Sequence, residues 1–151
     1  MRIFAAADHG GFELKQAIVA RLRAAGHDVT DLGTDSPESV DYPAFAHAVA
    51  RAVADGRADR GLLCCGTGLG VCMTANRHPG VRAADCFTPE MAEITRKHND
   101  ANVLCLGGRL LGVDDAWAIT QAWLATPFEG GRHERRIAAI DDLDADLAPS
   151  A

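Results

Sequence analysis

Short apolar runs alternate with longer segments of helical period along almost the whole of this 151-residue chain. Each run is short enough to be a buried strand, and the intervening segments repeat apolar residues as one face of a helix does. The runs are Ile3–Ala7, Val29–Leu32, Gly61–Cys65, Val81–Cys86 and Val103–Leu106. Such alternation predicts a parallel sheet with helices on both sides. We therefore expect a three-layer α/β/α sandwich with a five-stranded, Rossmann-like parallel sheet.

Proline and glycine mark where the first helices begin and end. The first helix is predicted to end before Gly26, and the second to begin near Pro43 and end before Gly56. Apolar residues mark one face of each, at Leu14, Ile18 and Leu22 in the first and at Ala46, Val49, Ala50 and Val53 in the second. Later helices are predicted over Pro89 to about Lys97, Val113 to Ala125 and Arg132 to about Leu147.

The size and charge of the chain limit its function class. With 151 residues, 48% of them hydrophobic, we expect one domain over residues 1–151 with a frayed tail from about Ala148 to Ala151. The net charge of −6 argues against a nucleic-acid partner, since binding to phosphates needs a clustered positive field.

The cysteines and the N-terminus indicate a cytoplasmic protein. The cysteines are Cys64, Cys65, Cys72, Cys86 and Cys105. Their number is odd, and their spacing gives no CxxC pair and no zinc pattern, so we expect free thiols and no metal. The run Ile3–Ala7 is too short for a signal sequence or a membrane span, so we expect no membrane partner.

One cysteine stands where a thiolate would be favoured. Cys65 ends an apolar run and is followed by the glycine-rich turn Gly66-Thr67-Gly68-Leu69-Gly70, which leads into a helix-compatible segment through Asn76. Backbone amides in such a turn can converge on an anion. Cys65 is therefore a candidate acid/base group, and the alternative is an inert cysteine at the end of a buried strand.

Polar residues also follow the first strand. Asp8-His9-Gly10-Gly11 comes after Ile3–Ala7, and in a parallel sheet this group lies at the same edge as Cys65. Helix capping would account for Asp8 and Thr67, but it does not explain His9 beside two glycines.

Two further groups combine histidine or arginine with a helix end. His98 closes the predicted third long helix, where it is either a general acid/base or a cation that complements the helix dipole. Arg132 and Arg136 are four residues apart after Gly130-Gly131, so on a helix they point the same way. They would either grip one phosphate or form a solvated face paired with nearby acidic residues.

Six ordered motifs together resemble one enzyme family. They are Asp8-His9-Gly10-Gly11-Phe12, Asp41-Tyr42-Pro43, Cys65-Gly66-Thr67-Gly68, His98-Asn99-Asp100, Gly107-Gly108-Arg109 and Gly130-Gly131-Arg132-His133. In this order they resemble the ribose-5-phosphate isomerase B family, which also contains galactose-6-phosphate and allose-6-phosphate isomerases. The resemblance runs from residue 1 to about 140.

The resemblance implies a metal-free and cofactor-free aldose–ketose isomerisation through an enediolate, as in the non-oxidative pentose phosphate pathway. It implies that Cys65 moves the proton from C2 to C1 and that Thr67 helps to move the hydroxyl protons. The turn from Gly66 to Gly70, with Gly68 and Leu69, would hold the enediolate oxygen. His98 would open the sugar ring.

The resemblance also implies how the phosphorylated sugar is bound. Asp8, His9, Tyr42, Asn99 and Arg109 match positions that contact the substrate, and Arg132 and Arg136 match the phosphate grip. The family's active site lies at a dimer interface, with the His-Asn segment coming from the neighbouring subunit. We therefore expect a homodimer or homotetramer.

Val71 separates this interpretation from three others. It occupies the position of the third glycine in a dinucleotide-binding GxGxxG turn, and that of the arginine six residues after the cysteine in cysteine phosphatases. Some members of the resembled family use a glutamate there as the base, so this chain is of the cysteine type. A non-catalytic sugar-phosphate sensor remains an alternative, as does an isomerase of a hexose 6-phosphate or a tetrose 4-phosphate.

Overall fold

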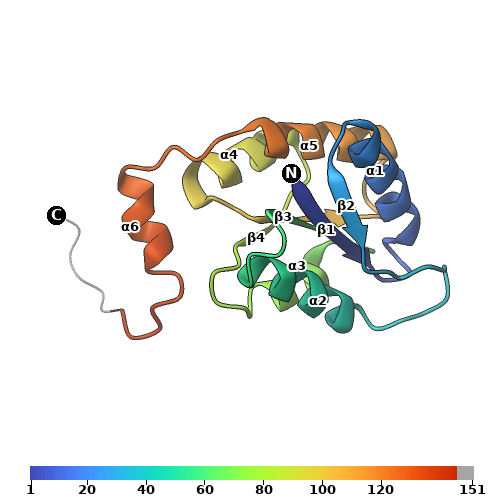
Figure 1. The fold of residues 1–151 in the computed structure, drawn as a ribbon, viewed down its shortest axis with the longest axis horizontal. Coiled ribbons are helices and arrows are strands. Elements are labelled where there is room, and N and C mark those ends of the chain that lie inside the picture. Colours follow the sequence, from blue (N-terminus) through green and yellow to red (C-terminus); the bar gives the residue numbers. More distant parts are fainter. Residues whose placement is uncertain (146–151) are drawn as a thin grey trace.

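The computed structural model describes residues 1–145 and has a five-stranded parallel sheet at its centre (Figure 1). The strands are β1 (Arg2–Ala7), β2 (Asp28–Asp31), β3 (Arg60–Cys65), β4 (Ala83–Asp85) and β5 (Val103–Gly107). Their order across the sheet is β2-β1-β3-β5-β4, and every neighbouring pair is parallel. The predicted five-stranded parallel sheet is confirmed, and β3 lies at its middle.

Helices cover both faces of the sheet. They are α1 (Phe12–Ala24), α2 (Tyr42–Ala54), α3 (Leu69–Ala75), α4 (Pro89–Asn99), α5 (Val113–Ala125) and α6 (Arg132–Ala138). Apolar side chains of α1, α4 and α5 pack with one face, and those of α2 and α3 pack with the other. Figure 1 shows these layers, with α6 projecting from the body beside α4. The three-layer prediction is confirmed.

The glycines predicted to follow the first two helices do so. Gly26 and Gly56 lie just past the ends of α1 and α2 with φ of 90° and 71°, a backbone conformation that glycine adopts without steric cost. The predicted helix over Val113–Ala125 matches α5, whereas α4 runs two residues beyond Lys97.

Two predicted elements are shorter than expected. The strand predicted over Val81–Cys86 is reduced to Ala83–Asp85, because the Val81 amide bonds to the His78 carbonyl and the Arg82 amide to the Asn102 side chain. The amides of these two residues are thus bound outside the strand ladder.

The last helix was predicted to run to about Leu147, and this is wrong, because α6 ends at Ala138. Aspartate side chains compete with helical hydrogen bonds, and Asp141 binds the Gly80 amide while Asp142 binds the Asp144 amide. Leu147 and the tail from Ala148 to Ala151 lie outside the described residues. None of the helices within residues 1–145 is long and apolar enough to cross a membrane.

Candidate active site

The Cys65 side chain is held at the end of β3 by the turn that follows it. The Gly68 amide donates a hydrogen bond to the Cys65 sulfur over 3.1 Å, and the thiol is almost fully buried. Gly68 has φ of 83°, which turns its amide back toward the strand end. Thr67 is exposed, and its hydroxyl accepts a hydrogen bond from the Leu69 amide at 3.3 Å. This geometry places the thiol against the amide of Gly68.

Cys64 and Cys65 pack on opposite faces of the sheet, because side chains alternate along a strand. Successive side chains of β3 point to opposite faces, so Cys64 packs with the α1 side of the core and Cys65 with the α2 side. Burial raises the pKa of the Cys64 thiol, as it does for Cys105, and it raises the pKa of Cys86 to about 12. These three thiols are therefore poor acid/base groups at neutral pH.

The groups after β1 and β3 share one edge of the sheet, as predicted. A β-carbon added to Gly10 would lie 2.9 Å from the Gly66 nitrogen, so the two loops touch. The Asp8 carboxylate accepts hydrogen bonds from the amides of Gly10 and Gly11 at 2.9 and 3.1 Å.

Capping accounts for part of the role of Asp8 and Thr67. Neither residue is an N-cap, since those positions are Gly11 for α1 and Gly68 for α3. The Thr67 hydroxyl nevertheless binds the amide of Leu69, the first residue of α3, and the Asp8 carboxylate binds the amides of Gly10 and of the N-cap residue Gly11. They help to shape the edge of the sheet at which Cys65 lies.

The side chains of Tyr42, Arg109 and His9 also lie at this edge. The Tyr42 ring covers Gly70, where a β-carbon would lie 2.7 Å from the ring, and the Arg109 guanidinium lies against Gly66. His9 accepts the Val40 amide at Nδ1 over 3.2 Å, so a neutral His9 ring carries its proton on Nε2. Arg109 is exposed and forms no ion pair with any residue in the range 1–145.

The predicted site residues His98 and Asn99 lie at the opposite edge of the sheet. They end α4, which begins after the carboxyl end of β4 and returns to the amino ends of the strands. Arg82, just before β4, donates to the Asn99 carbonyl at 3.0 Å. The six residues of β3 span about 20 Å, so the sheet separates this edge from Cys65.

Arg132 and Arg136 lie with His98 rather than with Cys65. They are both on α6, which packs against α4, and the Glu129 amide binds the Lys97 carbonyl just before α6 begins. Both arginines are exposed, and neither forms an ion pair among the described residues. The alternative of an arginine face paired with acidic residues is therefore not seen in residues 1–145.

His133, which ends the motif Gly130-Gly131-Arg132-His133 but was not among the predicted site residues, is a neighbour of His98. The two imidazole rings stack with centroids 4.4 Å apart and planes 13° apart. Burial, the neighbouring His98 and nearby arginines lower the pKa of His133. Both Nε2 atoms lie near Glu129, at 4.0 and 3.8 Å.

These three side chains could supply metal ligands, since their candidate ligand atoms lie within 4.8 Å of one another. An imidazole binds a metal in the plane of its ring. Stacked, nearly parallel rings do not point at one ion. The arrangement therefore fits a metal poorly, and it is better described as a stacked pair of rings beside one carboxylate.

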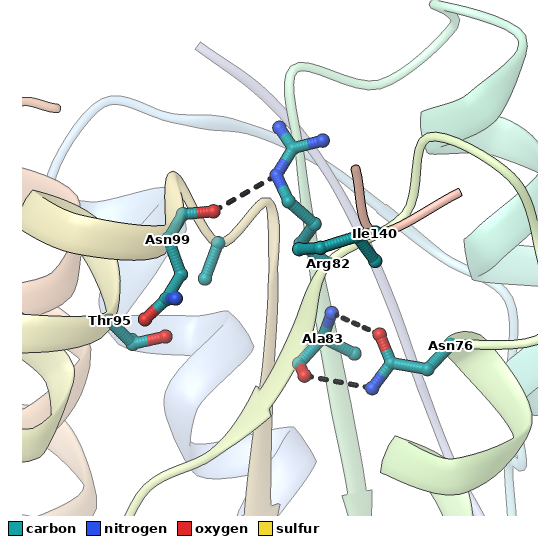
Figure 2. Close-up of a pocket in the computed structure, with 7 residues that line it drawn as sticks. Asn76, Arg82, Ala83, Thr95, Asn99 and Ile140 are labelled. Carbon is teal, nitrogen blue, oxygen red and sulfur yellow. Dashed lines mark hydrogen bonds between the residues drawn. The ribbon is translucent and has the colours of Figure 1, made fainter. Parts of the chain in front are cut away.

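A pocket of about 280 Å³ adjoins Asn99 at this same edge (Figure 2). Arg82 lines it, and the Asn76 side chain binds both the amide and the carbonyl of Ala83. Figure 2 shows the Asn99 backbone joined to Arg82 across the pocket. No sequence motif marks Arg82 and Asn76, because their contacts depend on where α3 and α4 meet β4.

Comparison with known proteins bears on these motifs. The profile of the ribose/galactose isomerase family matches residues 3–140. The chain belongs to this family.

Members of the ribose/galactose isomerase family resemble the chain over nearly its whole length. Ribose-5-phosphate isomerase B of Escherichia coli strain K12 is 48% identical over 137 residues, covering 91% of this chain and 92% of that protein. The crystal structure of a ribose 5-phosphate isomerase from Thermotoga maritima is 50% identical with a TM-score of 0.93, covering 94% of this chain and 98% of that one.

A third member was solved with a sugar phosphate. Ribose-5-phosphate isomerase B from Mycoplasma genitalium, with bound ribulose 5-phosphate, is 42% identical with a TM-score of 0.91 and covers 95% of both chains. The family resemblance inferred from the motifs is thus confirmed.

Proposed function

We propose that this protein interconverts ribose 5-phosphate and ribulose 5-phosphate. The observation that carries the proposal is the Cys65 thiol at the carboxyl edge of the sheet, bonded at 3.1 Å to an amide of a glycine-rich turn. Membership of the ribose/galactose isomerase family adds the chemical class. An intramolecular proton transfer needs one base that can both take and return a proton, and a thiolate meets that need.

In the proposed reaction Cys65 removes the proton from C2 of the open-chain sugar and returns it to C1. The electron pair of the broken C–H bond passes into an enediolate, whose oxygen the amides of the Gly66–Gly70 turn stabilise. The Thr67 hydroxyl, exposed two residues after Cys65, would move protons between the O1 and O2 atoms of the substrate. The sugar is oxidised at C2 and reduced at C1, so no external redox partner is needed.

The proposed site takes residues from two copies of the chain. The sheet separates His98, Asn99, Arg132 and Arg136 from Cys65 within one copy, so a monomer cannot bring both groups to one sugar. A homodimer, or a homotetramer built from such dimers, would place the α4 end of one copy at the Cys65 edge of the other. His98 of the partner would then open the furanose ring by proton transfer.

The remaining residues of the proposed site bind the substrate. Arg132 and Arg136 point from one face of α6 and would hold the phosphate through charge-assisted hydrogen bonds. Asp8, His9, Tyr42, Asn99 and Arg109 would contact the sugar hydroxyls and the phosphate. The guanidinium of Arg109, which has no ion-pair partner within residues 1–145, and the Nε2–H of His9 supply donors at the Cys65 edge.

The family includes both ribose and galactose isomerases, so the length of the sugar is tested with substrates of several lengths. Five free cysteines, of which Cys72 and Cys105 lie in contact, fit a reducing compartment. We therefore infer a cytoplasmic enzyme that acts on a free sugar phosphate.

The test is an NMR time course of ribose 5-phosphate in D2O with the wild type and with Cys65→Ala. We expect ketose formation and deuterium entry at the transferred carbon with the wild type only. A folded Cys65→Ala variant that keeps full turnover would overturn the role of Cys65.

Hexose 6-phosphates and tetrose 4-phosphates are run in parallel. Faster turnover of one of these would replace the pentose as substrate. Binding of sugar phosphate without turnover, unchanged in Cys65→Ala, would support the sensor alternative instead.

A further inference from the structure

Asp85 is a buried carboxyl without a partner among residues 1–145. It ends β4, and both of its carboxyl oxygens are buried and accept no hydrogen bond from this part of the chain. It forms no ion pair with any residue in the range 1–145. Buried carboxylates are normally paired or hydrogen-bonded, because desolvation of a charge costs free energy. This side chain therefore calls for an explanation outside fold stability.

The Asp85 carboxyl lies directly behind the turn that holds Cys65. A β-carbon at Gly68 would collide with both Asp85 oxygens, so only glycine leaves room for them. The amide of the same Gly68 donates the hydrogen bond to the Cys65 sulfur. One glycine thus separates the proposed base from a buried carboxyl on the other side.

The groups that face Asp85 do not neutralise it. They are thiols on each of the neighbouring elements, Cys72 of α3, Cys105 of β5 and Cys86 just after β4. Burial raises the pKa of Asp85 from 3.8 to about 6, so the group is charged at neutral pH. For Cys86 and Cys105 the Asp85 charge adds to the effect of burial and raises the pKa further.

We propose that Asp85 is a positioning residue for the isomerisation. Its buried negative charge opposes negative charge on Cys65 across Gly68, and this repulsion sets the pH at which the Cys65 thiolate forms. The inference rests on the proposed function for its catalytic consequence only. Like charges in a poorly solvated site each disfavour the other's ionised form. A base that forms against a like charge is a stronger base for proton abstraction.

The test measures the rate at which iodoacetamide alkylates Cys65 as a function of pH, in the full-length protein. Peptide mass spectrometry separates Cys65 from the other four cysteines, and iodoacetamide is uncharged, so the reagent itself does not sense Asp85. The variants are Asp85→Asn, which keeps the shape and removes the charge, and Asp85→Leu, which removes the polar group as well. Glu90→Gln is the matched control, because it removes a charge from an exposed position in the first turn of α4.

We expect both Asp85 variants to move the alkylation midpoint down by about one pH unit. Glu90→Gln is expected to leave the midpoint where the wild type has it. The acidic limb of the kcat/KM profile for ribose 5-phosphate should move by the same amount and in the same direction. A purely structural role would change thermal stability or KM without moving the alkylation midpoint.

The role of Asp85 would be overturned if the wild type and Asp85→Asn had the same pH profile of alkylation. It would also be overturned if the alkylation midpoint of Asp85→Asn lay at higher pH than that of the wild type. The alkylation readout needs no substrate. If the alkylation midpoint moves as expected while no sugar phosphate is turned over, the proposed function fails and the Asp85–Cys65 interaction stands.

Discussion

The Gly68 amide and the Cys65 sulfur are joined by a hydrogen bond of 3.1 Å, which closes the turn between β3 and α3. A donor that points at a sulfur atom stabilises the thiolate more than the thiol. The bond is possible because Gly68 adopts φ of 83°, and a side chain there would collide with Asp85. The backbone of one glycine therefore connects the proposed base to a buried carboxyl.

Cys65→Ser should lower kcat for isomerisation by at least about 10²-fold, because a serine hydroxyl is a far weaker acid than a thiol and removes the proton-transfer group. The matched control is Cys64→Ala, since Cys64 is the next residue but packs on the other face of the sheet. Cys64→Ala should retain most of the activity. The measurement is a coupled or NMR assay at saturating substrate, and comparable losses in the two variants would contradict the assignment.

Mixing two inactive variants should restore activity if each site takes residues from two subunits. Cys65→Ala keeps His98, and His98→Ala keeps Cys65. A heterodimer of the two has one intact site, so subunit exchange at equal concentrations should give about a quarter of the wild-type activity. The mixture is assayed after partial unfolding and refolding. Activity no greater than the sum of the separate variants would mean that each site lies within one subunit.

Much of the fold could be predicted because its signals are local. Apolar runs, Pro43, Gly26 and Gly56 each act within one element, and the alternation of elements implies the parallel sheet. The carboxyl ends of parallel strands lie at a common edge, so the sequence predicts that Asp8 and Cys65 are close together.

The parts that could not be predicted depend on contacts between distant elements. The end of α6 depends on Asp141. Its carboxylate accepts a hydrogen bond from the amide of Gly80, which is distant in the sequence. The sequence predicts Asp85 only as part of a strand, and its place behind Gly68 follows from the packing of α3 on β4. The sequence motifs contain no information about such packing.

Lys15→Met should destabilise the protein by about 3–5 kcal/mol, because it removes one partner of a buried ion pair. Lys15 is fully buried on α1 and donates to the Asp31 carboxylate at 2.6 Å and to the Thr34 carbonyl at 2.8 Å. Methionine fills a similar volume, so the loss reports the missing charge and hydrogen bonds. The free energy of unfolding is measured with urea. Arg21→Met is the control, since its ion pair with Asp114 is exposed, and it should cost less than about 1 kcal/mol.

Chelation should leave the isomerisation rate unchanged. The proposed mechanism stabilises the enediolate with backbone amides and moves protons with Cys65 and Thr67, so it needs no Lewis acid. The measurement compares initial rates before and after dialysis against EDTA, with a metal-dependent isomerase as a positive control. Loss of activity that a divalent ion restores would contradict the prediction.

Asp85→Asn should stabilise the protein at neutral pH and have little effect near pH 4. Burial raises the pKa of Asp85 in the folded state from 3.8 to about 6, so the unfolded chain loses this proton first as pH rises. Wild-type stability therefore falls between about pH 4 and pH 6, and the whole penalty is present above that range. Asparagine has no such titration.

The difference in unfolding free energy between Asp85→Asn and the wild type should thus grow from near zero at pH 4 to about 1–2 kcal/mol at pH 7. This value is reduced from that of a fully buried group because solvent has partial access to the residue. Urea unfolding at several pH values measures it, with Glu90→Gln as the control for loss of one surface charge. A difference that is constant with pH would mean that the amide changes packing rather than charge. A difference that shrinks as pH rises would mean that the Asp85 carboxylate is stabilised in the folded protein.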